Sequence, residues 1–263
     1  MTHIGILKPD AYIRILNFVG LPLVSLYVVS MFIVPWFSGS KDWGYVHGVW
    51  YDWQSLNVAM LAFLSSIVAF NIGRYNAEKQ RERNFTAAKA FLPESLSELV
   101  SYFKASARLL EEAWEKLDSM QNHVREPLIS PVPNLPTQYK EVFARAIEHA
   151  EPDVGKYLAY ILMRLQIHHA RIKELHDAFG PGGNLIIVPA NIMSYLYGLA
   201  ELLALVNRLY GFARNMEPFN DKALSWDDYG NAYANLDIYP EEYDDLVGFT
   251  RRTLAKRAAA ERT

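Results

Sequence analysis

Three histidines are the residues whose type best suits metal or acid–base chemistry. His168, His169 and His176 lie in the segment LQIHHARIKELH. Metal-binding histidines on one helix usually stand three or four residues apart, whereas His169 and His176 stand seven apart. His168 falls on the apolar stripe between Leu165 and Ile172, so we interpret it as a hydrogen-bonded histidine of the core. We therefore predict no metal site and no cofactor.

Carboxylate pairs and one glycine-rich turn are the other patterns that could support catalysis. A general acid needs burial to raise its pKa, and the acidic pairs stand in polar surroundings that predict exposure. The GPGG sequence at residues 180–183 follows a helical segment and lacks the strand, Lys and Ser/Thr of a phosphate-binding loop. We predict no catalytic residue. The pairs considered are Glu111 and Glu112, Asp227 and Asp228, Glu241 and Glu242, and Asp244 and Asp245.

The composition excludes several classes of protein. The 263 residues include no cysteine, which rules out a disulfide framework, a thiolate metal site and a cysteine nucleophile. The formal net charge of -3 shows no basic excess, so we do not expect nucleic acid as a partner. The mean hydropathy of -0.03 averages a very apolar first quarter and an ordinary charged remainder.

Two long uncharged runs in that first quarter predict transmembrane helices. Between Arg14 and Lys41 there are 26 uncharged residues, and between Asp52 and Arg74 there are 21. A hydrocarbon layer of roughly 30 Å needs about 20 helical residues. We predict a transmembrane hairpin over residues 1–73, whose first run stays attached rather than being cleaved as a signal peptide. Its Ser and Asn residues are interpreted as helix-packing groups first and as pore-lining groups second.

The short loop between the two runs is rich in aromatic residues, and such rings settle at the headgroup level of a bilayer. Lys and Arg are concentrated after the second run. The positive-inside rule then places both termini in the cytoplasm and the aromatic loop outside. The lipid bilayer is thus the first predicted partner. The predicted membrane-interface residues are Trp36, Trp43, Trp50, Trp53, Arg74, Lys79, Arg81 and Arg83.

The rest of the chain predicts helices only, so the expected fold class is all-α: an N-terminal transmembrane hairpin followed by a cytosolic helical bundle. We expect a juxtamembrane helix over residues 74–92 and a cytosolic domain over residues 93–263. Within it, the helix at about 189–214 is apolar nearly all round, which indicates the centre of a bundle. A third span from Asn184 to Val206 is the alternative. We favour the core, because Glu201 would be costly in lipid.

In the C-terminal segment, acidic residues are grouped in one stretch and basic residues in the next. Ser225 precedes Asp227 and Asp228 in the manner of a helix-capping box. Seven carboxylates lie between residues 227 and 245, and five basic residues lie between 251 and 262. We interpret them first as solvated helices with complementary charges. The alternative is a basic tail that touches anionic lipid and an acidic face that meets a partner.

Three sequence segments carry a resemblance over most of the chain: AAKAFLPESLSELVSYFKASARLL after the hairpin, then LQIHHARI, then SWDDYGNAYANLDIYPEEYDDLVGFTRR. The chain resembles a family of bacterial inner-membrane proteins with two transmembrane helices, a helical cytosolic domain and no assigned activity. The resemblance implies the bacterial inner membrane as location. The architecture is also similar to that of some membrane effectors of antiphage systems, which is an analogy of arrangement alone.

Three functional hypotheses follow. The first is a membrane-anchored interaction or sensor module that meets a cytoplasmic protein partner through its helical domain. The second is a homo-oligomeric channel or membrane-disrupting effector, because two helices cannot enclose water without further copies. The third is a membrane enzyme with an unrecognised site around His168 and His169.

Overall fold

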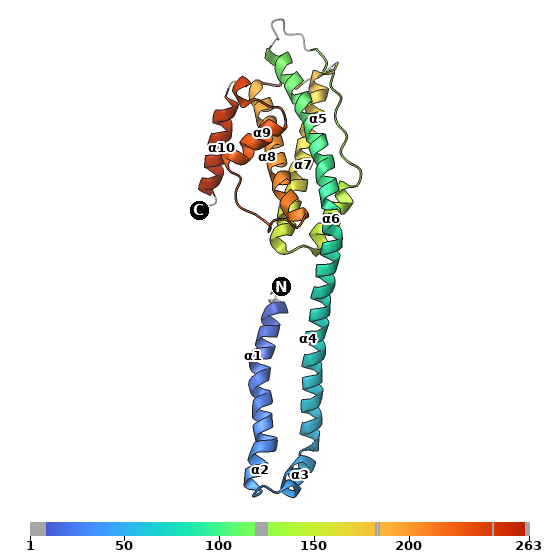
Figure 1. Cartoon of the computed structure of the whole chain (residues 1–263), viewed down its shortest axis with the longest axis vertical. Coiled ribbons are helices and arrows are strands. Elements are labelled where there is room, and N and C mark those ends of the chain that lie inside the picture. Colours follow the sequence, from blue (N-terminus) through green and yellow to red (C-terminus); the bar gives the residue numbers. More distant parts are fainter. Residues whose placement is uncertain (1–8, 119–125, 182, 184, 244, 261–263) are drawn as a thin grey trace, which may run out of the picture. The chain divides into compact units, whose positions relative to one another are not determined.

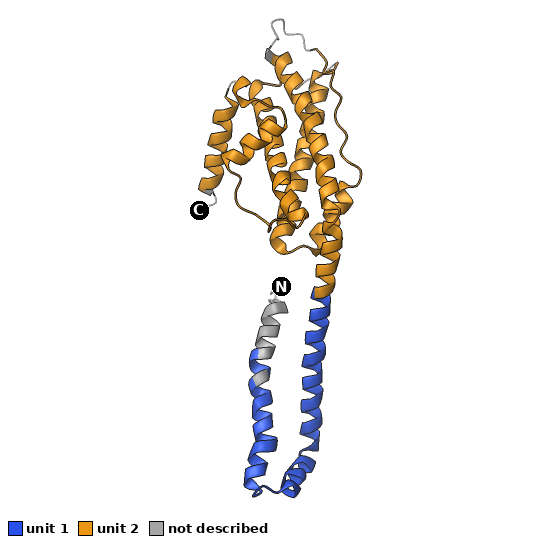
Figure 2. Cartoon of the chain, in the orientation of Figure 1, with its two compact units in different colours: residues 1–78 blue, residues 79–263 orange. Residues whose placement is uncertain are grey.

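The computed structural model describes residues 9–118, 126–181, 183, 185–243 and 245–260 (Figure 1). These ranges are helical and contain no strand, so the all-α prediction is confirmed for them. The chain divides into two compact units, residues 1–78 and 79–263 (Figure 2), and each is described by itself. Helix α4 (Gln54–Lys89) is unbroken and contributes to both units.

The first unit contains α1 (Pro9–Val28), the π-turn η1 (Val29–Ile33), α2 (Val34–Ser38), α3 (Trp43–Asp52) and the start of α4. Pro35 has no backbone N–H to donate to the carbonyl of Met31, four residues earlier. That carbonyl, which belongs to the short π-helix η1, instead accepts the indole N–H of Trp50 at 2.9 Å. The aromatic loop predicted between the two apolar runs is itself largely helical, because α3 occupies Trp43–Asp52.

Helix α4 presents two faces within this unit. Its half-buried face meets α1: the Tyr27 hydroxyl donates to Asn57 Oδ1 at 2.7 Å, and Ile67 lies beside Gly20. Small residues recur every three or four positions along an exposed face, and this spacing puts them roughly opposite α1. They are Ser55, Ala59, Ala62, Ser66, Ala69 and Gly73.

Two helical segments of this region are long and apolar enough to cross a membrane. One spans Phe18–Ser38, and the other lies within the helical stretch Gln54–Leu117, where the most apolar window has no buried residue. Apolar surface on this scale is costly in water and matches a lipid environment.

The second unit is a helical bundle with its own core. It contains α5 (Leu92–Asp118), α6 (Tyr139–His149), α7 (Pro152–Phe179), α8 (Pro189–Ala213), α9 (Trp226–Asn235), the 3₁₀-turn η2 (Pro240–Glu242) and α10 (Leu246–Ala260). Helix α8 lies at the centre and contacts α5, α7, α9 and α10, while α6 packs on α7 and α5. The central residues of α8, from Leu196 to Val206, are buried, which agrees with the prediction that this helix is apolar nearly all round.

Helix α8 is also the third segment that meets the length and composition of a membrane span. However, 67% of its apolar window is buried within the protein. This burial agrees with the prediction that α8 belongs to the core of the bundle rather than to the bilayer.

The helix boundaries follow local signals. Pro152 stands in the first turn of α7, where its missing N–H costs nothing, and Gly180 follows the last residue. Ser225 and Asp228 form the predicted capping box of α9. Helix α6 ends at His149, and Ala150 follows it in an extended conformation. The apolar run at residues 185–188 forms no strand and leads into α8 as an extended segment.

Candidate functional site

Glu201 is the charged residue around which the helical unit is organised. It lies at the middle of α8, with 1% of its surface exposed. Tyr160 and Arg164, one turn apart on α7, both donate hydrogen bonds to it, the tyrosine at 2.7 Å. Arg257 of α10 donates from both terminal nitrogens, at 2.5 and 3.3 Å. We call these four residues the Glu201 cluster.

The charges of the Glu201 cluster fix its protonation. Burial disfavours the Glu201 carboxylate, but the Arg257 hydrogen bonds and the Arg164 charge outweigh it and hold its pKa below the ordinary value. Burial and the bond to Glu201 raise the pKa of Tyr160 to about 12, so its hydroxyl stays a donor. Two guanidinium groups share one carboxylate, so the cluster carries one uncompensated positive charge.

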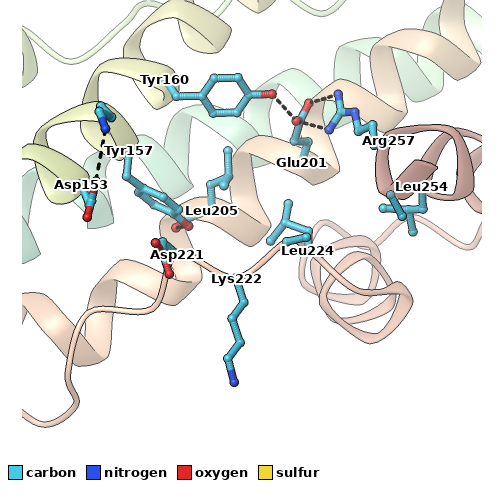
Figure 3. Close-up of a pocket in the computed structure, with 13 residues that line it drawn as sticks. Asp153, Tyr157, Tyr160, Glu201, Leu205, Asp221, Lys222, Leu224, Leu254 and Arg257 are labelled. Atoms are coloured by element: carbon cyan, nitrogen blue, oxygen red, sulfur yellow. Dashed lines mark hydrogen bonds and ion pairs between the residues drawn. The ribbon is translucent and has the colours of Figure 1, made fainter. Parts of the chain in front are cut away.

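A cavity of about 520 Å³ opens beside this cluster (Figure 3), and we call it the Glu201 cavity. Binding sites for small molecules typically measure roughly 300–1,000 Å³. Its walls come from α7, α8, α10 and the loop between α8 and α9. The residues that line it are Asp153, Lys156, Tyr157, Tyr160, Glu201, Leu205, Asp221, Lys222, Ala223, Leu224, Leu254, Arg257 and Ala258.

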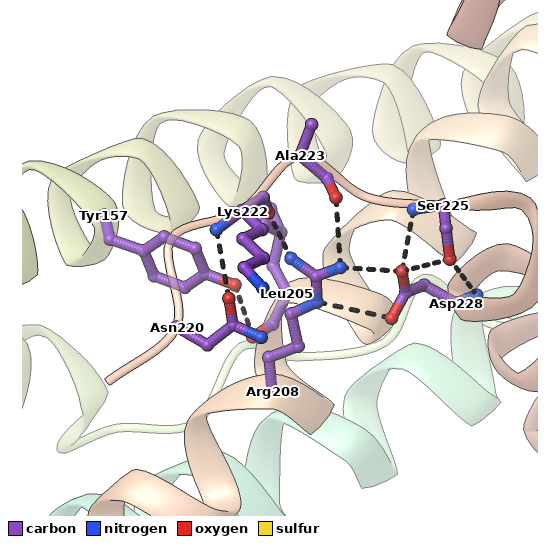
Figure 4. Close-up of polar contacts among 8 residues, drawn as sticks. All are labelled: Tyr157, Leu205, Arg208, Asn220, Lys222, Ala223, Ser225 and Asp228. Atoms are coloured by element: carbon purple, nitrogen blue, oxygen red, sulfur yellow. Dashed lines mark hydrogen bonds and ion pairs between the residues drawn. The ribbon is translucent and has the colours of Figure 1, made fainter. Parts of the chain in front are cut away.

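Arg208 of α8 holds the loop that forms one wall of the Glu201 cavity (Figure 4). Its guanidinium donates to the backbone carbonyls of Lys222 and Ala223 and forms a paired contact with Asp228, at 3.2 and 2.7 Å. Asp228 also accepts from the backbone and hydroxyl of Ser225, both at 2.7 Å. One arginine thereby joins the loop to the start of α9.

Helix α10 forms one wall of the cavity, and it is packed more closely on the bundle near its start than near its end. Near its start, Thr250 is buried and lies 2.9 Å from the Tyr233 hydroxyl. Farther along, Leu254 and Ala258 line both the Glu201 cavity and a second, more open hollow of about 530 Å³. The last turns of α10 therefore lie beside both hollows, and the partly exposed Arg257 joins them to the buried Glu201.

The histidines do not line the Glu201 cavity, although His168 stands one turn from Arg164 on α7. His168 is buried, with the Tyr102 ring edge-on at 6.0 Å, and burial lowers its pKa to about 3. Its placement in the core was predicted correctly, but its Nε2 atom has no hydrogen-bond partner among the described residues. His169 Nδ1 lies 3.1 Å from the Tyr102 hydroxyl.

Two of the carboxylates expected to be exposed are partly buried and hydrogen-bonded, which corrects that expectation. Glu112 accepts the backbone N–H groups of Ile129 and Ser130 at 2.6 and 2.8 Å. Asp228 pairs with Arg208. Both positions result from long-range contacts, which neighbouring residues do not encode. Asp244 lies outside the described residues.

The structure brings two of the four predicted interface tryptophans into contact with each other and packs a third on a phenylalanine. Trp36 and Trp43 have ring centroids 4.8 Å apart, and Trp50 packs edge-on against Phe32 at 4.6 Å. Trp53 is exposed. Their position at a membrane interface stays a prediction.

The four predicted basic interface residues differ in surroundings. Arg74 and Arg83 are exposed, and Lys79 pairs with Glu82 at 2.7 Å. Arg81 lies within the second unit, where it donates to the Ala150 carbonyl at 3.3 Å. Packing on the bundle is thus a role of Arg81 that the charge pattern did not predict.

The basic residues of α10 are largely engaged within the bundle. Arg252 pairs with Asp245 at 2.5 Å, Arg251 lies 4.8 Å above the Trp226 ring, and Arg257 joins the Glu201 cluster. Among these contacts, only the Arg252–Asp245 pair joins a basic residue of α10 to the acidic stretch at 227–245, as complementary charges would require.

One feature of the sequence indicated the Glu201 cluster: a lone carboxylate inside an apolar helix. It was used to argue against a third span, but its partners were not identified. Tyr160 and Arg164 stand four apart on α7, a spacing that places both on one helix face. Comparison with protein-family models, curated proteins and solved structures finds no match to this chain.

Proposed function

We propose that this chain is a membrane-anchored sensor module of the bacterial inner membrane. The hairpin holds the helical bundle at the bilayer, with both termini in the cytoplasm, and the bundle reports the state of the Glu201 cavity to a cytoplasmic protein partner. The two long apolar helical segments support the anchor. The basic residues after the second segment support the orientation.

The single observation that carries the sensing role is the attachment of α10. Its last turns lie beside both hollows, and the Glu201 cluster ties them to α8. A terminal element whose last turns lie beside open hollows opens at a lower free energy than the core does. An occupant of the Glu201 cavity that changes this anchor would change the surface that the bundle offers to a partner.

Hydrogen exchange on the full-length chain in lipid nanodiscs tests this role. We expect the amides of residues 251–260 to exchange through local opening, well ahead of those in the buried part of α8. Arg257→Gln should speed exchange in α10 and leave α8 unchanged. If α10 and α8 exchange together, only through global unfolding, α10 is not a separate moving element and the sensing role is wrong.

The anchor has its own test. The chain should remain in the membrane fraction after an alkaline carbonate wash, because apolar spans resist extraction. Release into the soluble fraction would contradict the membrane anchor. The hydrogen-exchange experiment on α10 would still test the sensing role separately.

A further inference from the structure

We propose that the Glu201 cavity binds a small amphipathic organic monoanion, whose charged group takes the remaining N–H donors of Arg257 and whose apolar part lies against Leu205, Leu224 and Leu254. This inference rests on the proposed sensing role and names the class of ligand that is sensed.

The charge of the Glu201 cluster selects an anion. Arg164 and Arg257 both pair with Glu201, which leaves one positive charge on a cluster whose Arg257 side chain is partly exposed at the cavity. One further negative charge beside Arg257 would neutralise the cluster through charge-assisted hydrogen bonds. A cationic ligand would add to the excess.

The hydrogen-bonding capacity of Arg257 agrees with this selection. A guanidinium has five N–H donors, and two of those in Arg257 are directed at Glu201. With 41% of its side chain exposed, Arg257 can offer the others to a carboxylate or phosphate at the cavity.

The remaining walls define the rest of the ligand. Leu205, Leu224 and Leu254 supply apolar surface, and the ring of Tyr157 adds an aromatic wall. Asp221 lies beside Tyr157, apart from Glu201 and Arg257 in Figure 3, so its negative charge does not stand at the proposed anion position. A molecule with one anionic end and one apolar end therefore fits both parts of the cavity.

Three probes with the same apolar body and different charges test the proposal: 3-phenylpropanoate, 3-phenylpropan-1-ol and 3-phenylpropylamine. Each is titrated calorimetrically into the full-length chain in nanodiscs of neutral lipid, with empty nanodiscs as reference. We expect saturable binding of one 3-phenylpropanoate per chain, about tenfold or more tighter than the alcohol, and no saturable binding of the amine.

Two tryptophan substitutions one turn apart locate the binding. Ala258 lines the Glu201 cavity, whereas Ala255 lines only the second hollow. Both side chains are exposed, so neither change should unfold the bundle. Ala258→Trp should weaken 3-phenylpropanoate binding by about tenfold or more, while Ala255→Trp should leave it unchanged. Arg257→Gln should abolish the preference for the acid over the alcohol.

Several results would overturn the proposal. They are equal binding of the acid and the alcohol, tighter binding of the amine, loss of binding in Ala255→Trp alone, or absence of saturable binding by the acid. None of them would alter α10 exchange or membrane retention in the unliganded chain. Failure of the ligand class is therefore distinguishable from failure of the sensing role.

Discussion

Ion pairs of the second unit are expected to contribute differently to stability, depending on how deeply the side chains are buried. Glu201 and Glu141 each pair with arginine, yet Glu201 is buried whereas Glu141 and Arg145 are both about two-thirds exposed. Exposed pairs are screened by water and stabilise little, whereas an unpaired buried charge is expensive. The two pairs therefore form a natural comparison within one protein.

Glu201→Ala should lower the free energy of unfolding by about 3–5 kcal/mol, because two guanidinium groups lose their shared carboxylate. Glu141→Ala should change it by about 0–1 kcal/mol. Denaturant unfolding of the full-length chain, followed by far-ultraviolet circular dichroism, measures both. Equal effects of the two substitutions would mean that the cluster does not stabilise the bundle.

Glu112 should contribute to stability in a defined pH range. Burial opposes its ionisation, but hydrogen bonds from Ile129, Ser130 and Lys116 outweigh burial and lower its pKa from 4.5 to about 2. A carboxyl with a lowered folded-state pKa stabilises fully above its unfolded value and loses this effect as pH falls through the folded value. Its contribution is thus present above pH 4.5 and lost towards about pH 2.

Glu112→Gln should accordingly flatten the loss of unfolding free energy between pH 4.5 and about 2. Glu98→Gln, at an exposed position on the same helix, is the matched control and should keep the steeper dependence. The free energy of unfolding of both variants, measured at a series of pH values, tests this prediction. A Glu112→Gln profile parallel to that of the parent chain would refute the assignment.

At the scale of elements, the loop between α8 and α9 depends on one residue of α8. Arg208 holds two consecutive carbonyls of that loop and the first turn of α9 at once. Without it, the three acceptors must find water, and the loop should open locally.

Arg208→Ala should speed tryptic cleavage after Lys222 by about tenfold, which corresponds to a local opening made easier by about 1.4 kcal/mol. Arg252→Ala removes an exposed ion pair with Asp245 and should leave the cleavage rate near that of the parent chain. Unchanged cleavage in Arg208→Ala would show that other contacts hold the loop.

At the scale of the whole molecule, the natural absence of cysteine allows the orientation to be tested directly. His47→Cys places one thiol on the exposed side of α3, and Lys222→Cys places one in the loop of the second unit. A membrane-impermeant maleimide should label the first in intact cells and the second only after permeabilisation. The reverse pattern would invert the proposed orientation.

The number of subunits separates the sensor from the channel hypothesis. We expect a monomer or dimer by native mass spectrometry after gentle extraction. A closed oligomer of four or more copies would instead favour the channel, because two helices per chain cannot enclose water alone. In that case the exposed small residues from Ser55 to Gly73 form the face on which a second helix can approach α4 most closely.

The sequence by itself determined the helical segments and their type. Uncharged runs long enough for a bilayer marked the two apolar segments of the first unit, and the uniformly apolar α8 marked the centre of the second. Ser225 with Asp227 and Asp228 marked the start of α9, and the GPGG sequence at residues 180–183 follows the end of α7. Such features depend on residues within a few turns of one another, which is why a pattern read along the chain reveals them.

Only the tertiary structure decided which distant residues meet. Glu201 and Arg257 stand 56 positions apart, and Arg164 approaches from a third helix. Arg208 pairs with Asp228, 20 positions along the chain, and the Trp50 indole donates to the Met31 carbonyl, to which Pro35 has no N–H to donate. These pairings depend on how whole helices pack, and the spacing of charges in the sequence does not specify that packing. The Glu201 cavity exists because packing brings α7, α8 and α10 around one buried carboxylate.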